Sequence, residues 1–423
     1  MTAVREKKKT RKLFSLTTQI LVATVGGIVF GSLVGPWAAN LKVFGDIFIR
    51  LIQMSVVLLV MTSVSSAIGN VSNKGAGKMG LHTFKWTILL TLVSAFLGLG
   101  LATFIQPGSG IRIGGTVVAK TAAQMPTKWT DILLGFVPTN VLNAMSSGTM
   151  VPCILFAILF GVAMGSYARH SGKTIVNEVV EGFNAVIMNI IKIVMKIAPI
   201  GVFCLLANVS GAIGFKVVIP MSKFLLLLLI GDIIQFLVYG PLTGLICKIN
   251  PLKMVGKYAK MSIMALTTTS SAICLPTKIE DSVTKFGVSR KVADFTGPIT
   301  MAMCSNGAVQ CYVAAILFMS QSTGIHLSAY QLVMAILLSC LMCMGTIVVP
   351  GGMVIVYTFL ATSLGLPIES IAVLIGIDWF SGMFRTVMNV DVDVMVSMLV
   401  SNDLGELDRD VYNEKKTVEY AQA

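Results

Sequence analysis

The first 250 residues alternate between long apolar runs and short polar segments. Several runs exceed the ~18 residues that mark a membrane-spanning helix, so the pattern predicts a polytopic, all-helical membrane protein. Pro36 and Pro107 end the first and third runs, and Pro199-Ile200-Gly201 interrupts the fifth. The predicted spans are 16–34, 44–68, 86–105, 150–164, 183–213 and 224–247.

After residue 250 the apolar segments are shorter and are broken by small or helix-breaking residues. Non-helical backbone at membrane depth persists only where protein buries it or where it lines a cavity. Paired interruptions of this kind favour re-entrant hairpins and a broken helix around a transport site over ordinary kinked spans. They fall at Thr267–Ser271 with Pro276, at Ser305-Asn306-Gly307, and at Gly345-Thr346 with Pro350-Gly351-Gly352.

Polar residues return in the last apolar segment at helical spacing. Asp378, Gly382, Arg385, Asn389 and Asp393 recur every three or four residues, which places them on one face of a helix. Ionisable residues at membrane depth usually face a cavity or one another and serve a site. Arg385 offers an anion receptor, Gly382 leaves a gap, and Asn389 and Asp393 offer oxygen ligands. This face predicts a site for an anionic solute beside a cation; the alternative is an Arg–Asp pair that only joins helices.

The composition agrees with a membrane location. The chain is 55% hydrophobic and 12% charged, against about 25% charged residues in soluble proteins. Its net charge of +13 does not indicate nucleic acid, because Lys and Arg gather in short loops such as 70–85, 169–173 and 248–260. The positive-inside rule makes these loops cytoplasmic. The basic segment 5–12 favours a cytoplasmic N-terminus on a first spanning helix over a signal peptide.

No motif in the sequence predicts an enzyme or a resident cofactor. The chain has no Gly-rich phosphate loop, HExxH motif or Ser/His/Asp arrangement. Its eight cysteines are scattered through apolar runs and are expected to pack as small hydrophobic residues. Cys340 and Cys343 form a CxxC motif, but without a second pair or a nearby histidine it is a weak metal signal.

Several motifs, in order, resemble the dicarboxylate/amino-acid:cation symporters, the glutamate-transporter family. The resemblance is to a prokaryotic member of this family, and it extends from about residue 16 to residue 400. The motifs are Phe44-Gly45-Asp46-Ile47-Phe48-Ile49-Arg50-Leu51, Phe136-Val137-Pro138-Thr139-Asn140, Ala198-Pro199-Ile200-Gly201-Val202-Phe203, Ser270-Ser271-Ala272 through Pro276, Val349-Pro350-Gly351-Gly352, and Arg385-Thr386 with Asn389 and Asp393.

The resemblance implies eight transmembrane helices plus two re-entrant helical hairpins, built as inverted repeats and assembled as a homotrimer in the prokaryotic inner membrane. A transport domain with spans three and six would move against a static scaffold, with lipid around both. The expected division is 1–15 as a basic cytoplasmic N-terminus, 16–250 as mainly scaffold and trimerisation spans, 251–401 as the transport domain, and 402–423 as a mobile cytoplasmic tail.

The resemblance also implies secondary active symport of an acidic amino acid or C4-dicarboxylate with sodium ions or protons, by alternating access. The implied sodium ligands are Asn389, Asp393, Ser305 and Asn306. The implied substrate-binding residues are Ser270, Ser271, Val349, Pro350, Gly351, Arg385, Thr386 and Asn389.

Departures from the family pattern put sodium coupling in question. The family's Asn-Met-Asp-Gly-Thr motif aligns with Cys304, Ser305, Asn306, Gly307 and Ala308, so two cation-binding oxygens are lost or neutralised. Sulfur is a poor substitute for oxygen around a hard cation. Val93-Ser94 also replaces the family's Thr-Ser pair. Coupling to fewer sodium ions, or to protons through Asp393, is therefore an open alternative.

Gly382 is the other departure, because members that carry aspartate or glutamate usually hold the substrate amino group with an Asp at this place. The substrate either lacks an amino group, or Asp391 supplies the charge, although its spacing points it away from the Arg385 face. A neutral, serine/threonine-type amino-acid symporter stays open, with Arg385 paired to Asp378, Asp391 or Asp393. A channel or a non-transporting scaffold is the alternative from another class.

Overall fold

The computed structural model describes residues 16–73, 77–111, 137–146, 150–343 and 353–418. All regular structure in these ranges is helical. Within the described ranges, four helical stretches are long and apolar enough to cross a membrane, or five if one bent pair counts as a single span. The predicted all-helical class is therefore confirmed.

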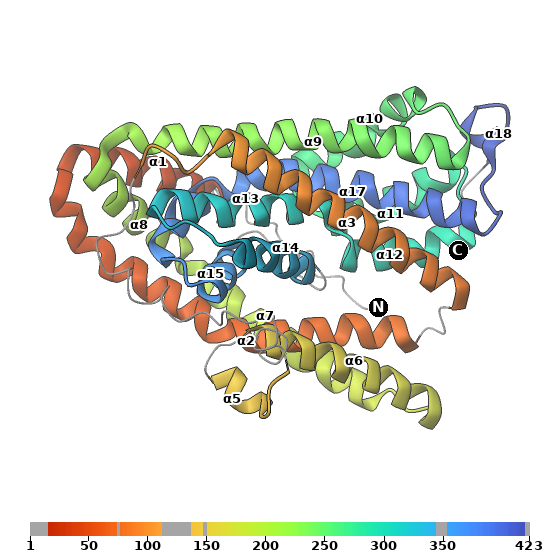
Figure 1. The fold of residues 1–423 in the computed structure, drawn as a ribbon, viewed down its shortest axis with the longest axis horizontal. Helices are drawn as coiled ribbons and strands as arrows, with labels where there is room; N and C mark the ends of the chain where they lie inside the picture. The colour runs from red at the N-terminus through yellow and green to blue at the C-terminus, as the bar shows by residue number, and fades with distance from the viewer. Residues whose placement is uncertain (1–15, 74–76, 112–136, 147–149, 344–352, 419–423) are drawn as a thin grey trace, which may run out of the picture.

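One group of helices comes from the first half of the chain (Figure 1). It contains α1 (Leu16–Val34), α2 (Lys42–Asn73), α6 (Met150–Ser171), α7 (Ile175–Val194) and α8 (Ala198–Ile213), with the short α5 (Val141–Ser146) beside α6. Helices α1 and α8 pack closely because α1 carries glycines at the contact. A Cβ atom at Gly31 would lie 2.2 Å from the carbonyl oxygen of Ala207.

A second group surrounds one long helix, α17 (Asp378–Asp403) (Figure 1). Apart from α16 (Ile371–Gly376), which directly precedes it, six helices in the described ranges pack against α17, and they bring together segments from residue 77 to residue 323. Most side chains of α17 and of α13 are buried, so these two helices form the centre of the group. The six are α3 (Gly77–Ile105), α9 (Val218–Cys247), α10 (Leu252–Thr268), α11 (Ser271–Thr284), α12 (Arg290–Met303) and α13 (Asn306–Thr323).

Two of the predicted interruptions, at Thr267–Ser271 and at Ser305-Asn306-Gly307, coincide with helix breaks, whereas Pro199-Ile200-Gly201 lies inside α8 and the break falls just before it. Thr269 has a left-handed backbone with φ 49° and ends α10, and Ser270 is extended and begins α11. Ser305 separates α12 from α13, and a 3₁₀ turn at Met195–Ile197 separates α7 from α8. Pro276 differs from the expectation, because it lies inside α11 and does not end it.

The last apolar segments form two further pairs of helices. Helix α14 (Ala329–Cys343) packs against α15 (Met353–Leu364), and residues 344–352 between them lie outside the described residues. A 3₁₀ turn (Ile368–Ser370) and α16 (Ile371–Gly376) precede α17, and the chain bends by 75° between α16 and α17. This bend sets Asp378 at the first turn of α17.

The C-terminal segment is packed through residue 418, so the expectation of a mobile tail was wrong for its described part. Tyr412 of α18 (Arg409–Tyr412) is fully buried and donates a hydrogen bond to the Asn250 carbonyl at 2.6 Å. Lys257 pairs with Glu414 at 2.8 Å, and this hydrogen bond lowers the pKa of the Glu414 carboxyl. Aromatic burial thus fixes the segment to the start of α10. Helices α10 and α11 pack against each other and are called the first hairpin below.

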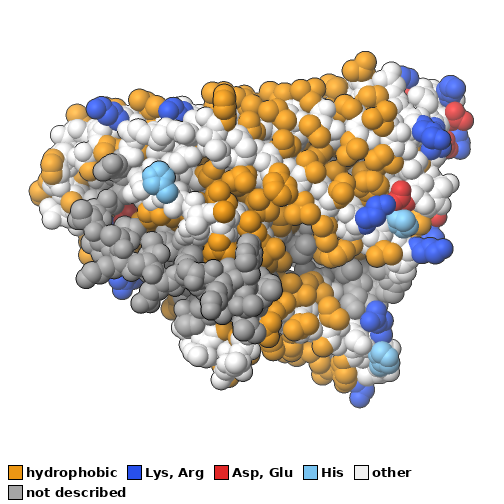
Figure 2. All heavy atoms as spheres, in the orientation of Figure 1, with side chains coloured by type: hydrophobic (Ala, Val, Ile, Leu, Met, Phe, Trp, Pro, Cys, Tyr) orange, Lys and Arg blue, Asp and Glu red, His pale blue; other side chains and the backbone are white. Residues whose placement is uncertain are grey.

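The surface is divided by chemistry along the long axis (Figure 2). Hydrophobic side chains cover much of the middle of the visible face, and Lys and Arg lie mainly towards its two ends, with most at the end where α18 lies. Such a band of apolar surface between charged ends suits a helical protein embedded in a bilayer.

Candidate functional site

The tip of the first hairpin lies against the polar face of α17. A Cβ atom at Gly382 would stand 3.9 Å from Cβ of Thr269 and 3.3 Å from Nη2 of Arg385. The left-handed turn at Thr269 therefore brings Ser270 and Ser271 towards the arginine that the helix pattern selected. The Ser271 hydroxyl is buried and has no hydrogen-bond partner among the described residues.

Arg385 is buried and only partly paired. Its Nη2 donates to Oδ1 of Asp378 at 3.1 Å, and the two side chains are 7% and 12% exposed. Its Nη1 is also buried but has no hydrogen-bond partner in the described part of the chain. Nη2 is thus bonded within α17, and Nη1 can donate hydrogen bonds to an anionic group.

Thr386 and Asn389 use their side chains within the protein. The Thr386 hydroxyl donates to the Gly382 carbonyl at 2.7 Å, and Oδ1 of Asn389 accepts from the Ala308 amide at 3.2 Å. The second bond satisfies one of the free amide groups at the start of α13. Asn389 therefore joins α17 to the broken helix.

The break between α12 and α13 lies beside the same face of α17. The Ser94 hydroxyl of α3 donates to the Asn306 carbonyl at 2.6 Å. The Asn306 amide nitrogen donates to Sγ of Cys304 at 3.2 Å, and Oδ1 of Asn306 is buried with no partner among the described residues. Ser305 is buried as well. The break thus offers oxygen atoms, but a thiol occupies part of it.

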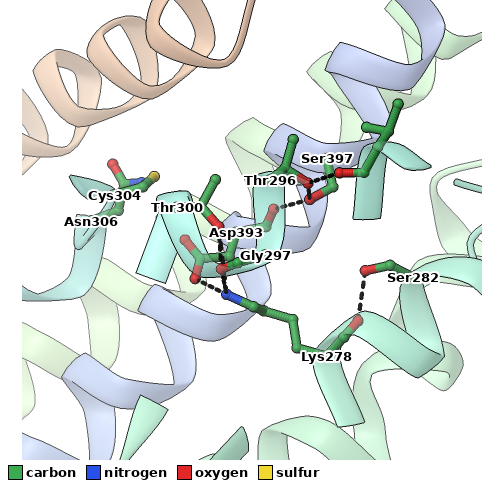
Figure 3. Close-up of polar contacts among 10 residues, drawn as sticks. Lys278, Ser282, Thr296, Gly297, Thr300, Cys304, Asn306, Asp393 and Ser397 are labelled. Carbon is green, nitrogen blue, oxygen red and sulfur yellow. Dashed lines mark hydrogen bonds and ion pairs between the residues drawn. The ribbon is translucent and has the colours of Figure 1, made fainter. Parts of the chain in front are cut away.

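Asp393 is held by a lysine of the first hairpin (Figure 3). Nζ of Lys278 lies 2.6 Å from Oδ2 of Asp393, and both side chains are almost fully buried. In the sequence Lys278 stands among other charged residues, which hides its relation to the site. It follows Ser271 by seven residues on α11. Two helical turns put these residues on the same face, and that spacing was a signal that could have identified Lys278.

Asp391 lies on a different side of α17 from Arg385. Its Oδ2 accepts a hydrogen bond from Ser262 of α10 at 2.8 Å. Two residues along a helix correspond to roughly 200° of rotation, which separates Asp391 from Asp393 and from the Arg385 face. Its carboxylate is thus directed to the stem of the first hairpin.

Some predicted residues cannot be placed. Val349, Pro350 and Gly351 lie outside the described residues. Within the described ranges no group of three or more His, Cys, Asp or Glu side chains is arranged to hold a metal ion. Cys343 of the CxxC motif donates to the Cys340 carbonyl at 3.0 Å, as a packed thiol does.

Comparison with known proteins adds an independent observation. The profile of the sodium:dicarboxylate symporter family matches residues 16–403. The proton/glutamate-aspartate symporter of Bacillus subtilis is 30% identical over 391 residues, which cover 90% of this chain and 93% of the relative. The proton/sodium-glutamate symport protein of Bacillus caldotenax is 28% identical, covering 96% and 97%. The C4-dicarboxylate transport protein of Agrobacterium fabrum is 28% identical, covering 93% and 89%.

Proposed function

The chain belongs to the sodium:dicarboxylate symporter family, and on that premise we propose that it carries an acidic amino acid or a C4-dicarboxylate into the cell together with cations. Relatives named for each of these substrate classes align with nearly the whole chain. The apolar helices and the bacterial relatives agree with a multi-pass protein of the inner membrane. The protein is a secondary active transporter in this proposal.

The observation that carries the proposal is that Nη1 of Arg385 has no hydrogen-bond partner among the described residues. A guanidinium stays charged at all physiological pH values and binds carboxylates through two parallel hydrogen bonds. Nη1 of Arg385 is buried without a partner among the described residues, and the unpaired Ser271 hydroxyl lies on the adjoining hairpin. A substrate carboxylate would satisfy both. Ser270, Thr386, Asn389 and the segment with Val349, Pro350 and Gly351 would complete the site.

The surroundings of Gly382 favour a dianion that lacks an amino group. A buried ammonium needs a carboxylate or several acceptors close by. Gly382 offers no side chain, Asp378 is paired with Arg385, and Asp391 is bonded to Ser262 on the α10 side. A C4-dicarboxylate makes no such demand, so we place it ahead of aspartate and glutamate.

The arrangement of the helices supports the expected topology of eight spans and two re-entrant hairpins. In this proposal α10 with α11, and α14 with α15, are the hairpins. Residues 251–401, with α3 and α9, form the transport domain, and residues 16–250 supply mainly the scaffold. Both termini, 1–15 and 402–423, are cytoplasmic, and the scaffold forms a homotrimer.

A neutral amino-acid symporter is the second candidate, and the Arg385–Asp378 pair favours it. If Asp378 neutralises the guanidinium permanently, the site presents no net positive charge to the solute. The solute would then be recognised by hydroxyl and amide groups such as Ser271 and Asn389. This candidate differs from the first because it predicts that serine inhibits uptake and that succinate does not.

Uptake into proteoliposomes tests the proposal. Labelled succinate, L-aspartate and L-serine would each be offered under an inward sodium gradient, and then under a proton gradient without sodium. Accumulation of succinate above aspartate is the expected result. Serine uptake that succinate does not inhibit would favour the neutral carrier. Flux without saturation or accumulation would indicate a channel, and no flux of any solute would contradict transport.

A further inference from the structure

The ammonium group of Lys278 is surrounded by three oxygen atoms from two other helices (Figure 3). Nζ lies 2.6 Å from Oδ2 of Asp393, 2.8 Å from the Gly297 carbonyl and 3.4 Å from the Thr300 hydroxyl. Lys278 is 2% exposed and Asp393 is fully buried. All three ammonium hydrogens therefore have an acceptor, and the charge of Asp393 is balanced inside the protein.

A carboxylate, a carbonyl and a hydroxyl are the oxygen donors that hold a hard metal cation. In this chain the ammonium group stands where these three donors converge. A sodium ion at the same point would have to displace the ammonium, and one beside it would face a like charge in a site screened little by water. The local chemistry therefore disfavours sodium at Oδ2 of Asp393.

The other candidate sodium ligands differ in what they offer, because Oδ1 of Asn306 is buried without a hydrogen-bond partner among the described residues whereas Oδ1 of Asn389 already accepts one. Oδ1 of Asn389 accepts from the Ala308 amide, and the Asn306 amide nitrogen is bonded to the Cys304 thiol. Oδ1 of Asp393 is buried and has no hydrogen-bond partner among the described residues. A cation there would lie within the reach of the Lys278 charge, because both oxygens belong to one carboxylate.

We propose that Lys278 is a tethered cation that takes the place of a coupling sodium ion at Asp393. The charge is carried on α11 of the first hairpin, so it moves with the transport domain and is never released into the cell. Lys278 is thereby a residue that determines which cations the transporter requires. This inference rests on the proposed symport for its transport consequences, whereas its consequences for ion binding stand independently.

The test replaces the lysine by a small polar residue. Lys278→Ser removes the charge and leaves the oxygen atoms of Asp393, Gly297 and Thr300 around an open space. We expect this variant to gain a sodium activation of uptake on the order of tenfold, in the range of ordinary coupling between ligands. The wild-type protein should show no such sodium activation. Uptake by both proteins is measured at constant ionic strength, with choline as the replacement cation.

Two further variants isolate the site. Lys278→Ser combined with Asp393→Asn has no carboxylate, so it should lose the added sodium activation. Lys285→Ser is the matched control, because Lys285 pairs with Asp281 at the end of the same helix but is about one-third exposed. It should keep the sodium dependence of the wild-type protein.

Ion binding is measured without transport by the unfolding temperature of the detergent-purified protein in sodium and in choline chloride. We expect a sodium-specific rise in Lys278→Ser that is absent from the double variant and larger than any rise in the wild-type protein. Equal sodium responses in wild type and Lys278→Ser, in unfolding and in uptake, would overturn the inference. Absence of uptake in every protein, with the sodium-specific rise present, would contradict the proposed function and leave the tethered cation standing.

Discussion

Gly307 lies directly against the backbone of Arg385. A Cβ atom at Gly307 would stand 2.5 Å from the Arg385 carbonyl oxygen and 2.8 Å from its Cα atom. Real side chains do not approach backbone atoms so closely, so this glycine allows α13 to meet α17 at the residue that we propose to bind the anion. The geometry of the site depends on this contact.

Gly307→Ala should therefore displace α13 from α17. Overpacking of this kind costs about 1–3 kcal/mol, and we expect a lower unfolding temperature together with reduced uptake. Gly100→Ala in α3 is the control, because a Cβ atom there meets nothing within 4 Å. Uptake by Gly307→Ala at the wild-type level would show that the close contact is not required.

Arg385→Ala should abolish uptake of a dianion. Loss of a buried charged contact costs roughly 2–5 kcal/mol, which corresponds to a fall in uptake of about thirtyfold or more at low solute concentration. Arg385→Lys should recover little of this uptake, because an ammonium cannot form the paired hydrogen bonds of a guanidinium. The measurement is labelled succinate uptake, with the unfolding temperature as the check on folding.

Arg290→Ala provides the matched control for Arg385. Arg290 pairs with Asp294 on the exposed surface of α12, where a single ion pair contributes little. Its removal should leave uptake unchanged. If Arg385→Ala transported succinate as the wild-type protein does, the proposed anion receptor would be refuted.

Gly382→Asp should shift selectivity towards amino-acid substrates. A Cβ atom at this position would lie 3.9 Å from Cβ of Thr269 and 3.3 Å from Nη2 of Arg385, the end of a flexible side chain that can shift slightly to make room. A carboxylate one turn before Arg385 would accept hydrogen bonds from a substrate ammonium, worth about 1.5–3 kcal/mol or at least roughly tenfold in selectivity. The ratio of aspartate to succinate uptake measures the effect.

Gly382→Asn is the control for that selectivity change. Its amide has nearly the size of the carboxylate but no charge, so the aspartate preference should not increase by the same factor. Equal ratios in both variants would mean that shape at residue 382, and not charge, governs the choice of substrate.

Tyr412→Ala should detach the C-terminal segment from the first hairpin. Truncation of a buried aromatic side chain costs roughly 3–5 kcal/mol, and Tyr412→Phe, which loses the hydrogen bond to the Asn250 carbonyl, costs only about 1 kcal/mol. Limited proteolysis after residue 407 reports the detachment. Glu414→Ala, which removes a solvent-exposed partner of Lys257, should be cleaved by the protease at the same rate as the wild-type protein.

Much of the helical layout follows from the sequence because hydrophobic period and helix-breaking residues act locally. The break at Ser305 and the turn at Thr269–Ser270 fall where small and hydroxyl residues interrupt apolar runs. Pro276 misled the prediction because it lies in the second turn of α11, where a proline removes one backbone hydrogen bond but packing against α10, α12 and α17 keeps the helix continuous.

The sequence by itself also selected Asp378, Arg385, Asn389 and Asp393 as one face of a helix, because helical spacing depends on a single segment. It could not decide their partners. Lys278 and Asp393 are separated by 115 positions, and Tyr412 and Asn250 by 162. Only packing of distant segments brings such groups together. Tertiary structure therefore decided that Asp393 meets an ammonium, that Nη1 of Arg385 has no partner among the described residues, and that the C-terminal segment packs against the start of α10.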